Sequence, residues 1–138
     1  SVGPNNNYAL NPSFEADRVT MTTPAGWTTT NGTNLSGGHT GNWSWQLTGA
    51  ATLDQTVANL PNGTYTLSAW IKGSGATSAV LYAKGSGSTN QTTSLASANG
   101  TWTKFSVSGV TVSNGQSQIG ITTSVGTITV DDFVLVKN

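Results

Sequence analysis

The sequence predicts an all-β fold, a β-sandwich jelly roll made of two antiparallel sheets. Three observations support this prediction. Apolar residues recur at every second position in short runs, and Gly- and Asn-rich turn signals separate those runs at regular intervals. Nowhere do apolar residues recur at helical spacing over a useful length. Roughly nine or ten short strands of this kind are typical of a sandwich.

The clearest strand is Thr64 to Lys72, which follows the turn signal Pro61-Asn62-Gly63. Side chains alternate between the two faces of a strand, so one face is apolar and is expected in the core: Tyr65, Leu67, Ala69 and Ile71. The other face carries small hydroxyl residues, Lys72 and one large aromatic residue, Trp70. A tryptophan on a solvated sheet is suited to stacking against a ligand.

The remaining strands are expected at 8–15, 27–30, 43–48, 52–58, 77–84, 91–96, within 101–112, and at 116–123 and 127–136. Pro12 interrupts the first of these, which suits an edge or a bulge. The last two strands are expected to pair around Val125-Gly126. The Gly-rich stretch 31–42 is expected to be a loop. Residues 1–7 are interpreted as a linker remnant, and 8–138 as one domain.

The composition excludes several classes of partner. Only 7% of the 138 residues are charged and the formal net charge is zero, which gives no electrostatic attraction to nucleic acid or to an anionic membrane. No apolar run approaches the ~20 residues needed to span a bilayer. The chain has no cysteine, so a disulfide scaffold and a thiol nucleophile are excluded. A Thr-, Asn- and Gly-rich surface with few charges predicts a secreted, extracellular monomer.

Nothing in the sequence favours catalysis. A glycosidase usually needs two carboxylates about 5 to 9.5 Å apart, and the chain has only five acids: Glu15, Asp17, Asp54, Asp131 and Asp132. The single histidine, His39, has no G-x-S-x-G motif to support a catalytic triad. Histidine and cysteine ligands for a catalytic zinc are also missing.

Alternation along two further strands predicts a surface for sugar binding. It places Gln46 outside the core in 43–48, and Tyr82 and Lys84 outside it in 77–84. If these strands neighbour the central one, a single surface forms from Trp70, Tyr82, Gln46, Lys72 and Lys84. The aromatic rings would stack on the C–H faces of a sugar, and the glutamine and lysines would form hydrogen bonds with its hydroxyls.

A second location and a competing interpretation stay open. The second location is the loop end of the sandwich, where the candidates are Asn34, His39, Trp43 and Trp27. If a loop instead covers Trp70 and makes it part of the core, with no other uncovered aromatic residue on the outside, the domain is a structural spacer that binds no saccharide. Three other tryptophans are expected in the core: Trp27, Trp45 and Trp102.

An ordered set of short motifs resembles a known group of proteins. The motifs are 11–15 (NPSFE), 26–27 (GW), 39–41 (HTG), 62–70 (NGTYTLSAW), 102–103 (WT) and 130–133 (VDDF). In this order they resemble the galactose-binding-like jelly-roll carbohydrate-binding modules of bacterial glycoside hydrolases, and are most similar to the galactan-binding family 61. The resemblance implies a non-catalytic module that binds a galactan, xylan, glucan or exopolysaccharide and targets a covalently linked catalytic domain to it.

The resemblance also implies a structural calcium ion between the first and last strands. Carried over residue by residue, the ligands are Glu15, Asp131 and the backbones of Ser13, Gly38 and Gly41. Calcium takes six to eight hard oxygen ligands, chiefly carboxylates and carbonyls, and these residues supply such oxygens. In the alternative interpretation Glu15 caps a turn, and Asp131 and Asp132 face solvent.

Overall fold

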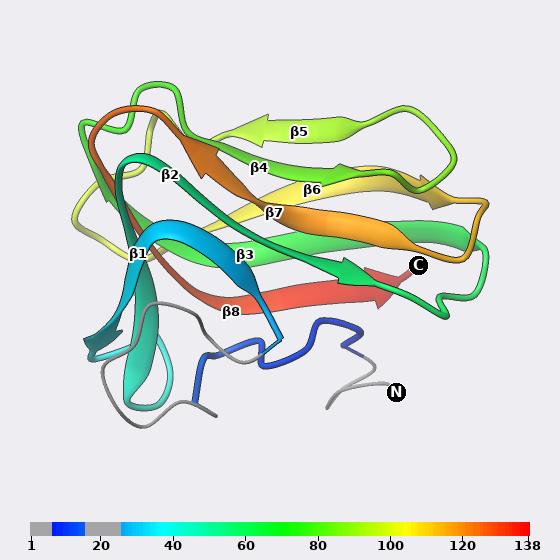
Figure 1. Ribbon diagram of the computed structural model, residues 1–138, viewed down its shortest axis with the longest axis horizontal. Helices are drawn as coiled ribbons and strands as arrows, with labels where there is room; N and C mark the ends of the chain where they lie inside the picture. Colours follow the sequence, from blue (N-terminus) through cyan, green and yellow to red (C-terminus); the bar gives the residue numbers. More distant parts are fainter. Residues whose placement is uncertain (1–6, 16–25) are drawn as a thin grey trace.

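The computed structural model describes residues 7–15 and 26–138. Its ordered elements are strands (Figure 1): β1 (Thr28–Ser36), β2 (Trp43–Val57), β3 (Gly63–Ser74), β4 (Val80–Lys84), β5 (Gln91–Ser94), β6 (Thr103–Val112), β7 (Ser117–Thr123) and β8 (Thr127–Lys137). Their pairing is antiparallel, in the order β5-β4-β7-β2-β8-β3-β6 with β1 against β2. The predicted all-β fold is confirmed. Within the described residues, no helix is long and apolar enough to cross a membrane.

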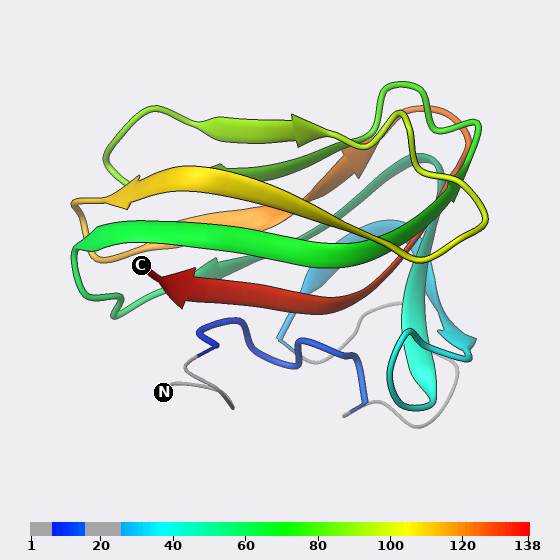
Figure 2. The same cartoon turned by 180° about the vertical axis from the view of Figure 1, so that it is seen from behind.

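The long strand β2 divides the sheet into two layers. Its first part pairs with β8 over residues 45–48, and its second part pairs with β7 over residues 51–57. Gly49, at a φ of 67°, lies between the two parts. We call the layer formed by β5, β4, β7 and the second part of β2 the upper layer, and the layer formed by β8, β3 and β6, which faces the viewer in Figure 2, the lower layer. The two strands expected at 43–48 and 52–58 are therefore one continuous strand.

The far edges of the two layers also come together. Figure 2 shows β5 and β6 running side by side at the back of the sandwich. Thr93 Oγ1 on β5 donates a hydrogen bond of 2.7 Å to the carbonyl of Ser106 on β6. Leu95 N bonds to Ala79 O at 2.8 Å just beyond β5. The Thr93–Ser106 bond therefore joins the edge strands of the two layers.

The predicted faces of β3 are confirmed. Tyr65, Leu67, Ala69 and Ile71 are each fully buried and belong to the hydrophobic core. Trp70 is half-buried and lies on the opposite face. Trp70 pairs with Asp131 of β8 on one side and with Lys104 of β6 on the other, so it lies in the middle of the outer face of the lower layer.

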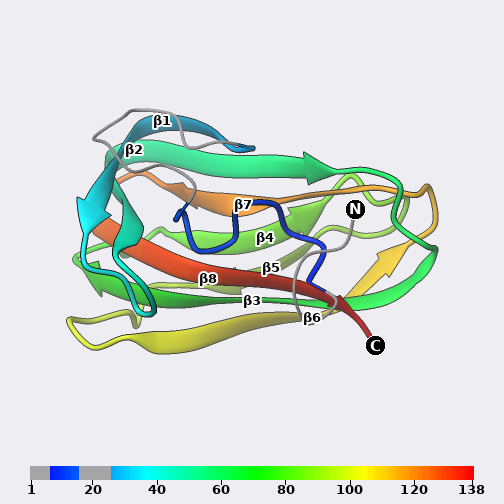
Figure 3. The same ribbon diagram turned by 90° about the horizontal axis from the view of Figure 1, so that it is seen from below.

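The segment 8–15 is not the strand that we expected. It is an irregular strap along β8, with bonds of 2.9 Å from Tyr8 N to Leu135 O and from Phe133 N to Pro12 O. Asn11 and Phe14 have φ angles of 43° and 59°, and Pro12 has no N–H, so a regular ladder cannot form. In Figure 3 the strap lies between β8 and β2, where the second part of β2 has left β8.

Two other expectations about the strands are wrong. The stretch 31–42 contributes to β1, which runs to Ser36 through a register shift between Thr30 and Gly32. Its residues are mostly polar, so the strand shows no apolar alternation. The strands β7 and β8 follow one another closely but do not pair, because β2 lies between them. A jelly-roll crossover of this kind leaves no local signal in the sequence.

An aromatic cluster closes the core beneath the strap. Phe14 packs against Trp27, Trp45 and Phe133, with ring centroids 5.6, 6.3 and 6.2 Å away. Trp27 and Trp45 are buried, as we expected. Aromatic side chains of this size each bury roughly 150–250 Å² and dominate the energetics of a core. The cluster therefore fastens the strap to β2 and β8.

Asn7, which we assigned to the linker, is part of this attachment. It is buried, its Nδ2 donates to Phe133 O at 2.7 Å, and its Oδ1 accepts from Leu135 N at 2.9 Å. We expect Asn7→Ala to lower the free energy of unfolding by about 1–3 kcal/mol, because it leaves a buried N–H and a buried C=O without these partners. Chemical denaturation measures the change. Asn90→Ala, at an exposed position, is the control, with an expected change within about 0.5 kcal/mol; equal effects would contradict the prediction.

Candidate functional site

The loop 37–42 lies between two carboxylates that come from distant parts of the chain. On one side, Glu15 Oε1 and Oε2 accept hydrogen bonds of 2.8 Å from the main-chain N–H groups of Asn42 and Trp43. On the other side, Asp131 Oδ2 accepts bonds of 2.8 and 3.2 Å from the N–H groups of His39 and Thr40. The loop therefore depends on the strap and on β8 for its shape.

Asp131 is fully buried although it is an acid. Its pKa is raised to about 7, first by burial and then by the neighbouring carboxylate of Asp132, although hydrogen bonds from three main-chain N–H groups act in the opposite direction. One of these bonds comes from Asp132 N to Asp131 Oδ1 at 2.9 Å. A buried carboxylate beside a second carboxylate is stabilised by a nearby positive charge.

The two glycines predicted as calcium ligands are crowded by oxygen atoms. A Cβ on Gly38 would lie 2.6 Å from both Asp131 Oδ2 and Trp43 O. A Cβ on Gly41 would lie 2.5 Å from Glu15 Oε1. Carboxylate and carbonyl oxygens are the donors that calcium prefers, so the chemistry of the donor set fits the ion.

The set of acidic side chains is small for a metal site. Across residues 7–15 and 26–138, no group of three or more His, Cys, Asp or Glu side chains has the arrangement to hold a metal. Ser13, the remaining predicted ligand, donates its Oγ to Asp132 Oδ1 at 2.5 Å. A cation at this loop would therefore take much of its coordination from main-chain oxygens.

The same loop places His39 over Trp70. The two rings are stacked, with centroids 4.0 Å apart and an interplanar angle of 12°. His39 Nδ1 lies 2.7 Å from Asp132 Oδ2, which fixes the orientation of the imidazole. The expectation that the Trp70 ring stands bare is therefore wrong, because the loop folds over the outer face. The loop-end and sheet-face candidates meet in one place.

Trp102 and Lys72 complete this surface. The Trp102 ring meets His39 edge-on, with centroids 5.8 Å apart, and Lys72 Nζ lies 4.9 Å from the centroid of the Trp102 ring. We call His39, Trp70, Lys72 and Trp102 the aromatic patch. Trp102 is half-buried and outside the core, contrary to our expectation. Alternation predicts this position, because Val107 faces the core and residues at even positions before it face outward.

Gln46 borders the aromatic patch. Both Gln46 and Lys72 are register partners of Thr129, on its two sides, and Gln46 Nε2 lies 3.5 Å from Thr129 Oγ1. The structure therefore brings together three of the predicted sugar ligands: Trp70, Lys72 and Gln46. The amide of Gln46, the hydroxyl of Thr129 and the ammonium of Lys72 lie on neighbouring strands, and the ammonium also contacts the Trp102 ring.

Tyr82 and Lys84 are not part of this surface. Three strands separate β4 from β3, so both residues lie on the outer face of the upper layer. Tyr82 is only 5% exposed, with Lys84 Nζ 4.8 Å from the centroid of its ring. Burial, and then the Asp54 carboxylate, raise the pKa of Tyr82 above its usual range. The prediction of one surface assumed that strands near in sequence are neighbours, which the jelly roll does not allow.

The other loop-end candidates are dispersed. Trp43 is half-buried at the start of β2, where it pairs with Ser36. Asn34 is buried on β1, and Trp27 is part of the core. Of this group only His39 reaches the aromatic patch.

Comparison with known proteins gives structural matches only. No family model matches the chain, and no curated protein matches it. The solved structure of TmCBM61 in complex with beta-1,4-galactotriose has a TM-score of 0.80 and 19% identity, over 96% of this chain and 99% of that one. A family 16 carbohydrate-binding module has a TM-score of 0.66 and 21% identity, over 95% and 100% of the two chains.

A third match is the CBM22-1 xylan-binding domain of Xyn10C from Paenibacillus barcinonensis. Its TM-score is 0.59 at 16% identity, over 91% of this chain and 92% of that one. All three identities are low, so the likeness is one of fold. It confirms the predicted jelly roll of carbohydrate-binding modules, including the similarity to a family 61 module.

The crowding around Gly38 predicts that its substitution opens the loop. We expect Gly38→Ala to lower the free energy of unfolding by about 1–3 kcal/mol, since the new methyl group collides with main-chain and carboxylate oxygens that cannot move independently. Denaturant titration tests this, with Gly100→Ala as the control because that position has no neighbour within 4 Å. A Gly38→Ala protein as stable as the control would disprove the crowding.

Proposed function

We propose that this protein is a non-catalytic carbohydrate-binding module whose aromatic patch contacts a polysaccharide. The observation that carries the proposal is the placement of Trp70 and Trp102 outside the core, on one face, beside His39 and Lys72. Large aromatic side chains outside a core usually serve recognition. The fold shared with carbohydrate-binding modules supports the same assignment.

The members of the aromatic patch have different roles in this proposal. Trp102 and the outer face of His39 provide the stacking surface for sugar rings, whereas Trp70 lies beneath His39 and supports it. Lys72, Gln46 and Thr129 offer hydrogen bonds to sugar hydroxyls. Binding at one such site is weak, because the hydroxyls are already well hydrated in water.

The ligand class that fits best is a neutral plant or microbial polysaccharide. The formal net charge of the chain is zero and only 7% of its residues are charged, so an acidic polymer gains little attraction. One structural neighbour was solved with beta-1,4-galactotriose and another is a xylan-binding domain. These two support galactan and xylan as the first ligands to test.

The acids of the described residues have non-catalytic partners, which supports a binding role. Glu15 and Asp131 accept main-chain N–H groups of the loop 37–42, and Asp132 bonds to His39 and Thr40. Asp54 lies beside Tyr82, while Asp17 lies outside the described residues. We infer that the module serves a secreted enzyme, because attachment to a polysaccharide raises the effective concentration of a linked catalytic domain.

Loss of the Trp102 ring tests the proposal. We expect Trp102→Ala to weaken binding to the preferred polysaccharide about tenfold, equal to about 1.4 kcal/mol, because the stacking surface is removed. Affinity gels and calorimetry with galactan, xylan and mixed-linkage glucan measure this. Lys84→Ala, on the upper layer, is the control. If Lys84→Ala weakens binding and Trp102→Ala does not, the site is on the upper layer, and if no glycan binds, the spacer interpretation holds.

We also propose that calcium binds at the loop 37–42, with Glu15 and Asp131 as its acidic ligands and the backbones of Ser13, Gly38 and Gly41 as further candidates. The proposal is supported by the oxygens around both glycines and by the burial of Asp131. A bound cation would offset the repulsion between Asp131 and Asp132. Its role is structural, since it would tie the strap and β8 to the loop that carries His39.

Removal of the ion tests this second proposal. We expect EDTA to lower the melting temperature of the native chain and added calcium to restore it. Asp131→Asn should lose most of the calcium response, whereas Asp54→Asn should keep it. A melting temperature that is the same in EDTA and in millimolar calcium would contradict the proposal.

A further inference from the structure

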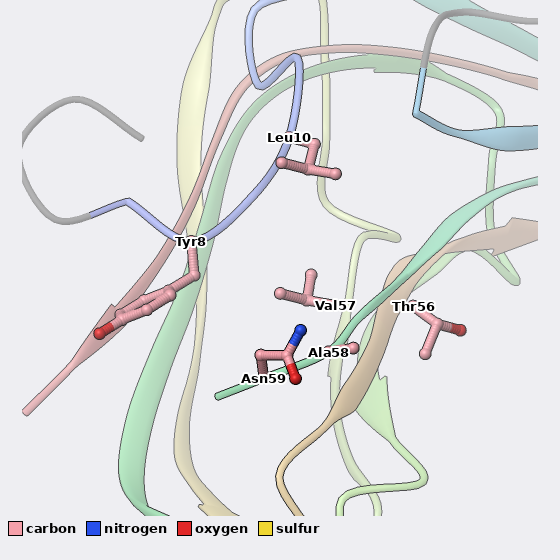
Figure 4. Close-up of a pocket in the computed structure, with 6 residues that line it drawn as sticks. All are labelled: Tyr8, Leu10, Thr56, Val57, Ala58 and Asn59. Atoms are coloured by element: carbon pink, nitrogen blue, oxygen red, sulfur yellow. The ribbon is translucent and has the colours of Figure 1, made fainter. Parts of the chain in front are cut away.

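A hollow lies at the other end of β2 from the loop 37–42. It has a volume of about 230 Å³ and opens between the strap and the end of β2 (Figure 4). We call it the strap pocket, and its lining residues are Tyr8, Leu10, Thr56, Val57, Ala58 and Asn59. The aromatic patch contributes none of these residues.

Hydrogen bonds hold the strap wall of this pocket in place. Tyr8 N donates to Leu135 O at 2.9 Å, and the Tyr8 ring packs edge-on against Tyr65 with centroids 5.7 Å apart. Leu10 is held through both its main-chain groups by the side-chain amide of Gln55, at 2.9 and 3.0 Å. Gln55 itself is buried, so the side chain that makes this pair of hydrogen bonds is held in the core. The wall is therefore formed before any ligand arrives, which lowers the cost of binding.

The strap pocket combines apolar walls with a polar rim. Leu10 is 46% exposed, an unusual value for a leucine in this chain, and Tyr8 is half-buried beside it. Asn59 is exposed and supplies an amide, whereas the hydroxyl of the exposed Thr56 points away from the other lining residues in Figure 4. No charged side chain is among the lining residues. Such a lining favours a neutral ligand that has both C–H and hydroxyl surfaces.

The backbone at Asn59 adds an independent observation. Its φ is 57°, in the left-handed region where glycine has no steric penalty and other residues pay about 1–2 kcal/mol. Asparagine is among the residues that tolerate this conformation best. A glycine there would leave the rim without the side-chain amide that now faces the pocket in Figure 4. Strain of this kind is often kept where the side chain has a function.

We propose that the strap pocket binds one neutral pyranose ring of a polysaccharide, a terminal or branch sugar, as a contact separate from the aromatic patch. This inference rests on the proposed glycan-binding function. The volume is below the roughly 300–1,000 Å³ of pockets for drug-sized ligands, which suits a single ring and not an extended oligosaccharide.

The second contact would raise the avidity for long chains. The strand β2 has 15 residues, so its two ends are separated by up to about 50 Å of strand. An oligosaccharide that occupies only the aromatic patch gains nothing from the strap pocket. A long polysaccharide can engage both, and the second contact is then intramolecular and favoured by effective concentration.

Amide chemical shifts of the ¹⁵N-labelled protein test the strap pocket directly. Galactose, xylose and glucose are titrated separately to millimolar concentrations, and the Leu10 and Asn59 amides are followed. We expect at least one monosaccharide to shift both amides. Asn59→Gly keeps the backbone conformation and should weaken this binding about fivefold, because one hydrogen-bonding amide is lost. Leu10→Ala should weaken it too, and Leu35→Ala, at another exposed leucine, should not.

The outcomes of these titrations test the strap pocket separately from the proposed function. If polysaccharide binding depends on Trp102 while no monosaccharide moves the Leu10 and Asn59 amides, the strap pocket proposal is wrong and the proposed function stands. If those amides respond to toluene but to no sugar, the pocket is an apolar hollow and the proposal is wrong as well. Shifts that persist in Trp102→Ala and weaken in Asn59→Gly support an independent sugar contact.

Discussion

The structure depends on two acidic side chains that bind the main chain of one loop. Glu15 and Asp131 lie more than a hundred positions apart in the sequence, yet both accept N–H groups of the loop 37–42. A main-chain bond of 2.7 Å from Gly37 N to Asn42 O closes the base of the loop, and the two carboxylates fix it to the strap and to β8. The position of His39 on Trp70 follows from the same bonds, so the fastening of the strap to β8 and the shape of the aromatic patch have a common cause.

The strap also supplies hydrogen-bond partners for main-chain groups of β8 that β2 does not reach. When β2 leaves β8 to join the upper layer, it exposes main-chain groups of β8 beside the core. The strap supplies partners for Phe133 and Leu135, and the Asn7 side chain binds both residues as well. Buried main-chain groups need such partners, which is why a segment that forms no regular strand is nevertheless packed into the seam. The same packing forms one wall of the strap pocket.

The sequence predicts the local features of this fold well and the distant ones less well. Alternation in β3 correctly places Tyr65 and Leu67 in the core and Trp70 on the outer face, because the two faces of a strand can be assigned from adjacent positions in the sequence. The order of strands is not local, so the placement of Tyr82 in the other layer could not be predicted from the position of its strand along the chain. The stacking of His39 on Trp70 depends on hydrogen bonds that His39 makes to the carboxylates of Asp131 and Asp132, which a periodic pattern of residues cannot indicate. The position of Trp102 outside the core could have been predicted, because extending the alternation back from Val107 places residue 102 on the outer face.

The strap has a consequence for how the folded chain responds to mechanical tension. Residue 7 and residue 138 lie at the same end of the antiparallel arrangement of the strap and β8, remote from the loop 37–42 (Figure 1). A pulling force applied between these two residues loads the bonds of Asn7 first, then that of Tyr8, then that of Pro12, one after another as in a zipper. Sequential loading breaks a ladder at lower force than shearing all of its bonds at once. The strap would therefore peel from β8 before the two layers separate, and the sandwich itself would give way last.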